Sequence, residues 1–327
     1  MRYEFFLQLV KDDLEKRLGN NYVVVLRTIP KNNGVVRDGI SISKIGESVA
    51  PTIYLNDWYQ ELLDGEPLSK ICSRIYQLYL TDPNLPYLDS NILASYESVK
   101  EHIVYKLINT QANASLLKKL PHIPFHDMSM ICYLLMERQE NGYITAFIYK
   151  DHLKTWNIQE KDLFLSAIQN TPRLLPPIIQ PMNDVLKQLA IEMLGDSYQD
   201  APLDILLETA AEYRIQENTL FPTLYVLTNQ ARINGAACMI YPQAIKDFAK
   251  SRNQDILILP SSIHEVLLIE DDGHYDYEDM STLVGEINSS EVPPEDRLSN
   301  QIYRYNRESD QITVVSHGTS LIGTGNR

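Results

Sequence analysis

The stretch from Ile256 to Ile269 constrains the fold more than any other part of the chain. Two apolar runs, Ile256–Leu259 and Val266–Ile269, flank a short polar turn that holds two serines, a histidine and a glutamate. Short runs of isoleucine, leucine and valine bounded by turn residues predict buried strands. Because consecutive strands joined by a short turn pair antiparallel, the stretch predicts two neighbouring strands in the core of a sheet.

The rest of the C-terminal half alternates strand and helix patterns. Short connections favour antiparallel pairing, and amphipathic helices need a sheet face to cover, so this half predicts an α+β lobe. The expected strands are Leu224–Leu227, Ala236–Ile240, Asp255–Leu259, Glu265–Ile269, Ile302–Tyr305 and Gln311–Val315. The expected helices are Asn183–Leu194, Asp204–Tyr213, Pro242–Lys250 and Tyr277–Asn288.

The N-terminal half predicts a second lobe of the same class. Met1–Leu18 has apolar residues at helical spacing and ends at Gly19, which suits the residue after a helix. Strand patterns at Tyr22–Ile29 and Val35–Ile45 flank an Asn-Gly turn and predict a hairpin. The later expected elements are a strand at Thr52–Leu55, a helix at Leu68–Leu80, a helix or a helix leading into a strand over Asn91–Ile108, a hairpin of Met128–Met136 with Tyr143–Tyr149, and a helix at Asp162–Asn170. The expected fold is therefore α+β with two lobes, each a mainly antiparallel sheet with helices packed on it.

Four prolines between Thr171 and Pro181 suggest where the lobes meet. Proline lacks a backbone N–H and clashes inside a helix, so this stretch predicts an extended connector. We expect an N-terminal lobe over residues 1–170, a connector over 171–182, an acidic lobe over 183–315 and a mobile Gly/Ser/Thr-rich tail over 316–327.

The chain is acidic, and the excess lies in its second half. The net charge is −14, and residues 151–327 hold 26 acidic against 13 basic side chains. A chain with no basic stripe is not expected to bind nucleic acid, whereas an acidic lobe could attract a basic protein partner. Its acidity also serves solubility, which is the simpler interpretation.

Three widely spaced cysteines in apolar segments suggest free thiols in a reducing compartment. The charged first 18 residues predict no signal peptide, and no apolar run is long enough to span a membrane. These features predict a cytoplasmic protein, and they leave its oligomeric state open.

The polar turn is the first candidate site. Ser261 or Ser262 with His264 and Glu265 supplies the residue types of a hydrolase, in which a histidine takes a hydroxyl proton and a carboxylate orients the histidine. No Gly-x-Ser-x-Gly elbow accompanies them, and catalytic triads are assembled from distant segments. Ser262 and Glu265 also match a capping box, in which both side chains bond to the backbone of one turn. We favour this structural interpretation.

Metal and cofactor motifs are weak. His122 and His126 stand four residues apart, but Pro121 and Pro124 argue against the helix that would place them on one face. The acidic run at 270–279 does not have EF-hand spacing. Phosphate-loop, dinucleotide-binding and Cys-x-x-Cys motifs are absent from the sequence. We therefore expect no metal and no cofactor.

A second candidate is a polar groove. Asn229, Asn234, Tyr303 and Arg304 lie on or beside strands of the acidic lobe and could line it. Alternatively, Asn234 belongs to an Asn-Gly turn and the Tyr-Arg pair has cross-strand neighbours only, which is the interpretation we favour.

Four stretches resemble an uncharacterised clostridial family that carries only a domain-of-unknown-function label. They are Thr223–Asn229, Asn234–Ala237, Ile258–Val266 and Ile302–Tyr305. The pattern around Trp156–Asn170 and the acidic lobe is similar to a second bacterial family of unknown function. The resemblance implies a cytosolic α+β protein and assigns no activity and no catalytic residues.

The sequence thus favours a non-enzymatic interaction or regulatory accessory protein. A hydrolase that uses Ser261 or Ser262 with His264 is the alternative. A small-molecule-binding module with a groove between the lobes is the third interpretation.

Overall fold

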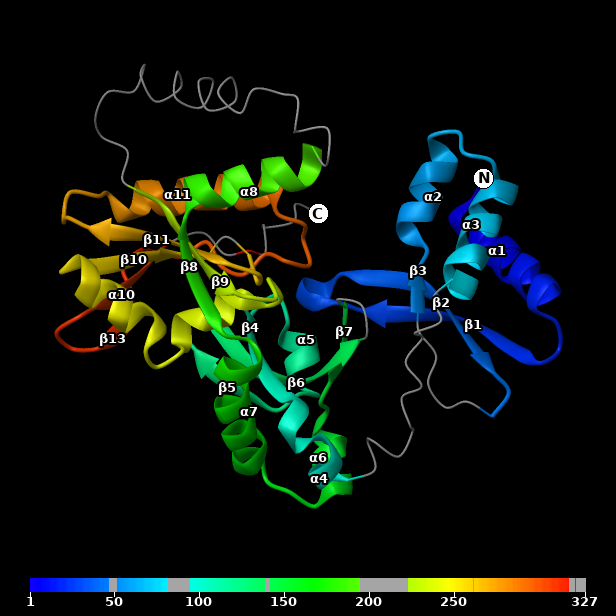
Figure 1. Cartoon of the computed structure of the whole chain (residues 1–327), viewed down its shortest axis with the longest axis horizontal. Helices are drawn as coiled ribbons and strands as arrows, with labels where there is room; N and C mark the ends of the chain where they lie inside the picture. The colour runs from blue at the N-terminus through cyan, green and yellow to red at the C-terminus, as the bar shows by residue number, and fades with distance from the viewer. Residues whose placement is uncertain are drawn as a thin grey trace. The chain divides into compact units, whose positions relative to one another are not determined.

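The structure is a computed structural model that describes residues 1–46, 52–81, 95–138, 142–194, 223–260, 262–317 and 321. The residues form two compact units, each built from several chain segments. Unit 1 contains Met1–Val104, Ala112–His122 and Cys132–Asn170, and unit 2 contains Tyr105–Gln111, Ile123–Ile131 and Thr171–Arg327. Helices and mainly antiparallel sheets confirm the predicted α+β class (Figure 1).

Unit 1 begins with a helix followed by a three-stranded antiparallel sheet in the order β1–β2–β3. The predicted first helix ends at Gly19, whose φ of 75° is easy for glycine alone. The predicted hairpin pairs residues 22 to 30 with residues 44 to 36. The elements are α1 (Tyr3–Leu18), β1 (Tyr22–Pro30), η1 (Asn32–Gly34), β2 (Val36–Lys44), β3 (Thr52–Tyr54), α2 (Asn56–Leu63) and α3 (Leu68–Thr81).

The first core of unit 1 lies between this sheet and the helices. Phe6, Val10 and Leu14 repeat every four residues, so one stripe of α1 is buried. Alternate residues of β2, Ile40 and Ile42, face the same core. The sheet therefore buries one face beneath helices, as Figure 1 shows for α1 and α3.

The middle of the chain forms a four-stranded sheet in the order β4–β6–β5, with β7 paired to β6. Asn91–Ile108 was expected as a helix or a helix leading into a strand, and residues 96–109 form two short helices and then a strand. The elements are α4 (Tyr96–Val99), η3 (Lys100–His102), β4 (Ile103–Asn109), α5 (Ala114–Leu117), β5 (His122–Phe125), β6 (Met128–Arg138), β7 (Gly142–Phe147), α6 (Lys150–Trp156) and α7 (Glu160–Leu174).

Unit 2 contains a six-stranded antiparallel sheet in the order β13–β12–β10–β11–β9–β8. The two strands predicted from Ile256–Ile269 are its central pair, β10 and β11. The elements are β8 (Pro177–Pro181), α8 (Met182–Leu194), β9 (Tyr225–Asn229), η5 (Gly235–Ile240), α10 (Ala244–Arg252), β10 (Asp255–Leu259), β11 (Val266–Asp271), α11 (Tyr277–Glu291), β12 (Tyr303–Asn306) and β13 (Gln311–Val314).

The two faces of this sheet are covered by different elements. Leu257 and Leu259 of β10 face Val284 of α11 in one apolar cluster. On the opposite face, Tyr225 of β9 makes an edge contact with Phe248 of α10, with ring centroids 4.9 Å apart. Figure 1 shows α11 and α10 on the two sides of the sheet. Since both faces are covered, the central strands are apolar on both sides, as their sequence predicts.

Two local predictions are wrong. The four prolines do not exclude helix, because Pro172 lies inside α7, whereas Pro177 and Pro181 bound an extended segment, strand β8. β8 is an edge strand, where proline removes no necessary ladder bond. The strand expected at Ala236–Ile240 is a 3-10 helix, η5, because Asn234 turns the chain with a φ of 50°.

Some predicted elements lie partly or wholly outside the residues that the structure describes. The helix expected at Asp204–Tyr213 falls outside the described residues. At the start of the expected tail, Ser316 is buried, and its hydroxyl accepts a bond from the Ile302 N–H at 2.8 Å. None of the described helices has both the length and the apolar character needed to cross a bilayer.

Candidate functional site

The turn between β10 and β11 holds the first set of predicted site residues. The Ser262 hydroxyl donates to Glu265 Oε1 at 3.0 Å and accepts from the His264 N–H at 3.0 Å. The Ser262 N–H donates to the carbonyl of Glu265 at 3.2 Å. The hydroxyl thus bonds to its own turn, as the structural interpretation expects, although no helical turn forms there. Ser261 lies outside the described residues.

The His264 ring is held by two partners from distant segments. Its Nδ1 accepts from the Asn234 N–H at 3.3 Å, so the ring proton lies on Nε2. Nε2 stands 3.5 Å from Asp296 Oδ1. The bond to Asp296 raises the pKa of His264, and partial burial opposes the shift without cancelling it. With both nitrogens occupied, the ring has no site at which to take a proton from a hydroxyl.

The chain around Asn234 is tightly packed against this turn. Thr228 donates its hydroxyl to the carbonyl of His264 at 2.7 Å. A Cβ on Gly235 would lie 2.1 Å from Thr228 Oγ1 and 2.5 Å from that same carbonyl, so only glycine fits. Asn229 closes the loop from the other end by bonding to both the N–H and the carbonyl of Ile233. These polar side chains serve backbone groups that a buried loop must satisfy.

The segment from Asp296 to Tyr303 follows α11 and is bonded from several directions. Buried side chains, rather than a regular ladder, satisfy much of its backbone. The Asp296 carbonyl accepts from the Ile263 N–H at 2.8 Å, and the Leu298 carbonyl accepts from Asn109 Nδ2 at 3.1 Å. The Ser299 carbonyl accepts from Asn288 Nδ2 at 3.0 Å, and the Asn300 carbonyl accepts from the Ser281 hydroxyl at 2.7 Å. The segment is thereby tied to β4, α11 and the 262–265 turn.

Tyr303 ends this segment and is fully buried. Its hydroxyl donates to Asp127, in the turn between β5 and β6, and also contacts Ser299 Oγ at 3.1 Å. Ser299 in turn donates to Asp127 Oδ2 at 2.7 Å. Burial, with Asp127 beside it, holds the pKa of Tyr303 far above its usual range. The hydroxyl therefore stays protonated and acts as a fixed donor.

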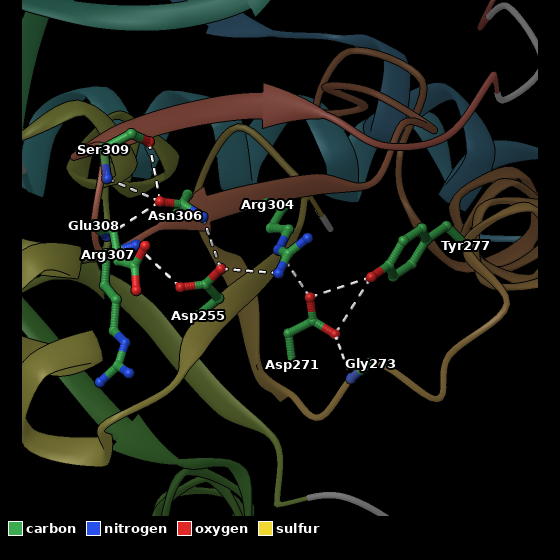
Figure 2. A network of polar contacts seen from close by, with 9 residues as sticks. All are labelled: Asp255, Asp271, Gly273, Tyr277, Arg304, Asn306, Arg307, Glu308 and Ser309. Carbon is green, nitrogen blue, oxygen red and sulfur yellow. Dashed lines mark hydrogen bonds and ion pairs between the residues drawn. The ribbon is translucent and has the colours of Figure 1, made fainter.

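Arg304 points to the opposite face of the sheet and joins a separate network (Figure 2). Asp255 and Asp271 are register partners across β10 and β11, so two carboxylates stand opposite one another. Arg304 Nη2 lies 2.9 Å from Asp255 Oδ2, and Nε lies 3.0 Å from Asp271 Oδ2. The second contact is ionic, since Nε makes no hydrogen bond of normal geometry. One guanidinium thus offsets a cross-strand repulsion.

Neighbouring groups complete the network around the two carboxylates. The Tyr277 hydroxyl, from the first turn of α11, and the Gly273 N–H donate to Asp271 at 3.1 and 3.0 Å. Asn306 Nδ2 and the Arg307 N–H donate to Asp255 at 3.1 and 3.0 Å. Asp271 is only 1% exposed, so these bonds are needed to hold its charge in the protein.

The residues expected to line a polar groove are not brought together. Tyr303 and Arg304 are adjacent on β12 and point to opposite faces. Asn229 and Asn234 belong to the loop after β9, where Asn229 bonds to its own loop and Asn234 to His264. Local sequence patterns do not indicate the bonds made by Asp127, Asp296 and Ser299, because their partners lie far away along the chain.

Metal and ligand chemistry has little support among the described residues. They contain no group of three histidine, cysteine or acidic side chains that could hold a metal ion. His122 lies in strand β5, so it does not share a helix face with His126, as the prolines predicted.

A hollow of about 340 Å³ lies between α1 and α3 in unit 1, and its lining includes Asp12, Asp13, Lys16 and Cys72. Burial raises the pKa of Cys72 to about 11, so its thiol is not an activated nucleophile.

Replacing Arg304 with methionine tests the cross-strand network. The variant leaves Asp255 and Asp271 facing one another without a cation, and we expect it to lower the free energy of unfolding by about 2 kcal/mol. Urea unfolding measures the loss. Combining Arg304→Met with Asp271→Asn removes the repulsion between the two carboxylates and should recover part of the lost unfolding free energy. A single variant within about 0.5 kcal/mol of the parent chain would show that the guanidinium is not needed.

The pH dependence of stability tests the His264–Asp296 contact. Because the folded-state pKa of His264 is raised, the contact stabilises fully below the ordinary value of 6.5 and is lost as pH rises through the folded value. The difference in unfolding free energy between the parent and Asp296→Asn should therefore shrink between pH 6 and pH 8. An NMR titration of the imidazole reads the pKa directly. A pKa at or below 6.5 would show that Asp296 does not stabilise the protonated ring.

The model of a family of unknown function (DUF5688) matches residues 3–307. That range covers every candidate residue described above and most of both units. No curated protein and no solved structure matches the chain. The predicted membership of a family labelled only by its unknown function is confirmed, and the chain belongs to the DUF5688 family.

Proposed function

We propose that the protein is a non-enzymatic cytoplasmic accessory protein that binds a basic segment of a partner protein on the exposed face of α11. The observation that supports it is a stripe along this helix, which we call the α11 stripe. The stripe consists of Asp279, Leu283, Glu286, Ile287 and Glu291. Leu283 and Ile287 are 56% and 47% exposed, and the acidic residues lie beside them on the surface.

The orientation of α11 is fixed by its buried side. Ser281 and Asn288 bond to the Asp296–Tyr303 segment, and Val284 packs on the sheet. The Asp276 carboxylate caps the first turn by accepting from the Glu278 and Asp279 N–H groups. Rotating the helix to bury Leu283 and Ile287 would break these bonds. The two apolar side chains are therefore held at the surface.

The chemistry of the stripe indicates the kind of partner. Residues four apart on a helix lie on one face, so the two apolar side chains form a small patch bordered by carboxylates. An amphipathic helix with leucines on one face and lysines or arginines beside them matches this pattern in both respects. The acidic excess of the second half would also speed the approach of such a segment.

The hydrolase is the second candidate and gains no support from the described residues. The Ser262 hydroxyl bonds within its own turn, and both nitrogens of His264 have other partners. A nucleophile–base pair needs one ring nitrogen directed at the hydroxyl.

Peptide binding tests the proposal. Fluorescence anisotropy with a labelled amphipathic helix of leucine and lysine should give saturable binding that weakens as salt is raised. Leu283→Ser with Ile287→Ser should weaken it more than tenfold, because each buried leucine or isoleucine contributes about 1.5–3 kcal/mol.

Two controls make the result specific. Leu165→Ser removes a leucine of α7 that is also largely exposed, and it should leave binding unchanged. A peptide with glutamate in place of lysine should not bind. Equal binding of both peptides, or binding that survives loss of Leu283 and Ile287, would contradict the proposal.

A further inference from the structure

The open edge of the three-stranded sheet in unit 1 is the starting point. β1 pairs with β2 on one side, and no described strand pairs with it on the other. It is nine residues long, its only charge is Arg27, and Val23 and Val25 are 45% and 38% exposed on its outer face. A long apolar edge of this kind is a template for pairing with another strand.

The other edge strands of the three-stranded and six-stranded sheets are protected. β3 has three residues and β13 has four, so each offers little backbone to an incoming strand. β8 begins and ends with proline, which has no N–H to offer. On β1 the only proline is Pro30, its last residue. The usual protection of an edge is therefore missing along residues 22–29.

The register tells which backbone groups of β1 point outward. The Ile45 N–H donates to the carbonyl of Asn21, and the Lys31 N–H donates to the carbonyl of Val35. Antiparallel pairs alternate between bonded and non-bonded, so the odd-numbered residues of β1 bond to β2. The N–H and carbonyl groups of Val24, Leu26 and Thr28 therefore point to the open edge.

We infer that the occupant of this edge is β1 of a second copy of the chain, paired antiparallel about a two-fold axis at Leu26. In that register Val24 faces Thr28 of the second copy, and Leu26 faces its own equivalent. Each of the three residues whose backbone groups point to the open edge then pairs with one of the same three residues in the second copy. A two-fold contact must be self-complementary in this way.

The ends of the strand fit the same register. Tyr22 of one copy lies opposite Pro30 of the other. Pro30 has no N–H, and the Tyr22 N–H already donates to the carbonyl of Gly19 at 3.3 Å. No outward N–H is thus left without a partner at the ends of the pair.

The side chains also agree with this pairing. On the outer face Val23 meets Ile29 and Val25 meets Arg27, and on the core face Leu26 meets Leu26. β1 carries no acidic residue, and no two like charges stand directly opposite. The pairing extends two three-stranded sheets into one six-stranded sheet. It involves unit 1 alone and is independent of the α11 stripe.

Proline at position 26 tests the pairing in the full chain. The Leu26 N–H makes no bond to β2, so Leu26→Pro removes an outward donor at the centre of the contact and leaves the β1–β2 ladder intact, although it also shortens a side chain that packs on the core. Light scattering after size exclusion should give twice the 37.5 kDa of one chain for the parent and for Leu26→Val, and the mass of one chain for Leu26→Pro. Circular dichroism checks that the proline variant is folded.

Cross-linking tests the register without relying on that variant. Val23→Cys with Ile29→Cys places two thiols opposite one another in the dimer, whereas within one chain they are about 20 Å apart. Mild oxidation should give a covalent dimer of the double variant, while either single variant stays uncrosslinked. A monomeric parent chain, a dimer that persists in folded Leu26→Pro, or no cross-link in the double variant would overturn the inference.

Discussion

Hydrogen bonds to the backbone of the Asp296–Tyr303 segment are the constraint on which the rest of unit 2 depends. The segment has no ladder of its own over most of its length, so side chains from β4, α11 and the 262–265 region satisfy it. Each such bond contributes only about 1 kcal/mol net, but breaking one leaves a buried polar group at a cost of about 1–3 kcal/mol. The same bonds orient α11 and, through Asp296, the ring of His264.

This arrangement accounts for the polar residues that crowd the core of unit 2, because each has a structural partner there. Ser262, His264, Tyr303 and Arg304 have the chemistry of catalytic groups, yet each one bonds to backbone or to a charged side chain of the fold. What remains available to partners lies on the surface. The α11 stripe offers apolar side chains between carboxylates, and the β1 edge offers backbone. The two surfaces would select partners by different chemistry.

Much of the fold could be predicted because its signals are local. The hairpin of β1 and β2, the helix α1 and the central pair β10 and β11 follow from spacing and turn residues. The failures have tertiary causes. Asn234 turns the chain with a φ of 50°, so the apolar run that follows forms η5 rather than a strand, and an edge position lets β8 carry two prolines.

The candidate site was only partly predictable for the same reason. The bond between Ser262 and Glu265 joins residues three apart, and its sequence pattern is visible. Tyr303 and Asp127 are 176 positions apart, and Ser299 and Asp127 are 172 apart, so no local pattern predicts them. His264 was singled out for its neighbour Glu265, but its carboxylate partner is Asp296.

We propose that these side chains hold the fold and do not catalyse. Treating the folded full chain with a serine-reactive phosphonate and mapping adducts by mass spectrometry tests it most directly. We expect no adduct on Ser262, because its hydroxyl is buried and no free imidazole nitrogen lies beside it. An adduct on Ser262 that disappears in His264→Ala would contradict it.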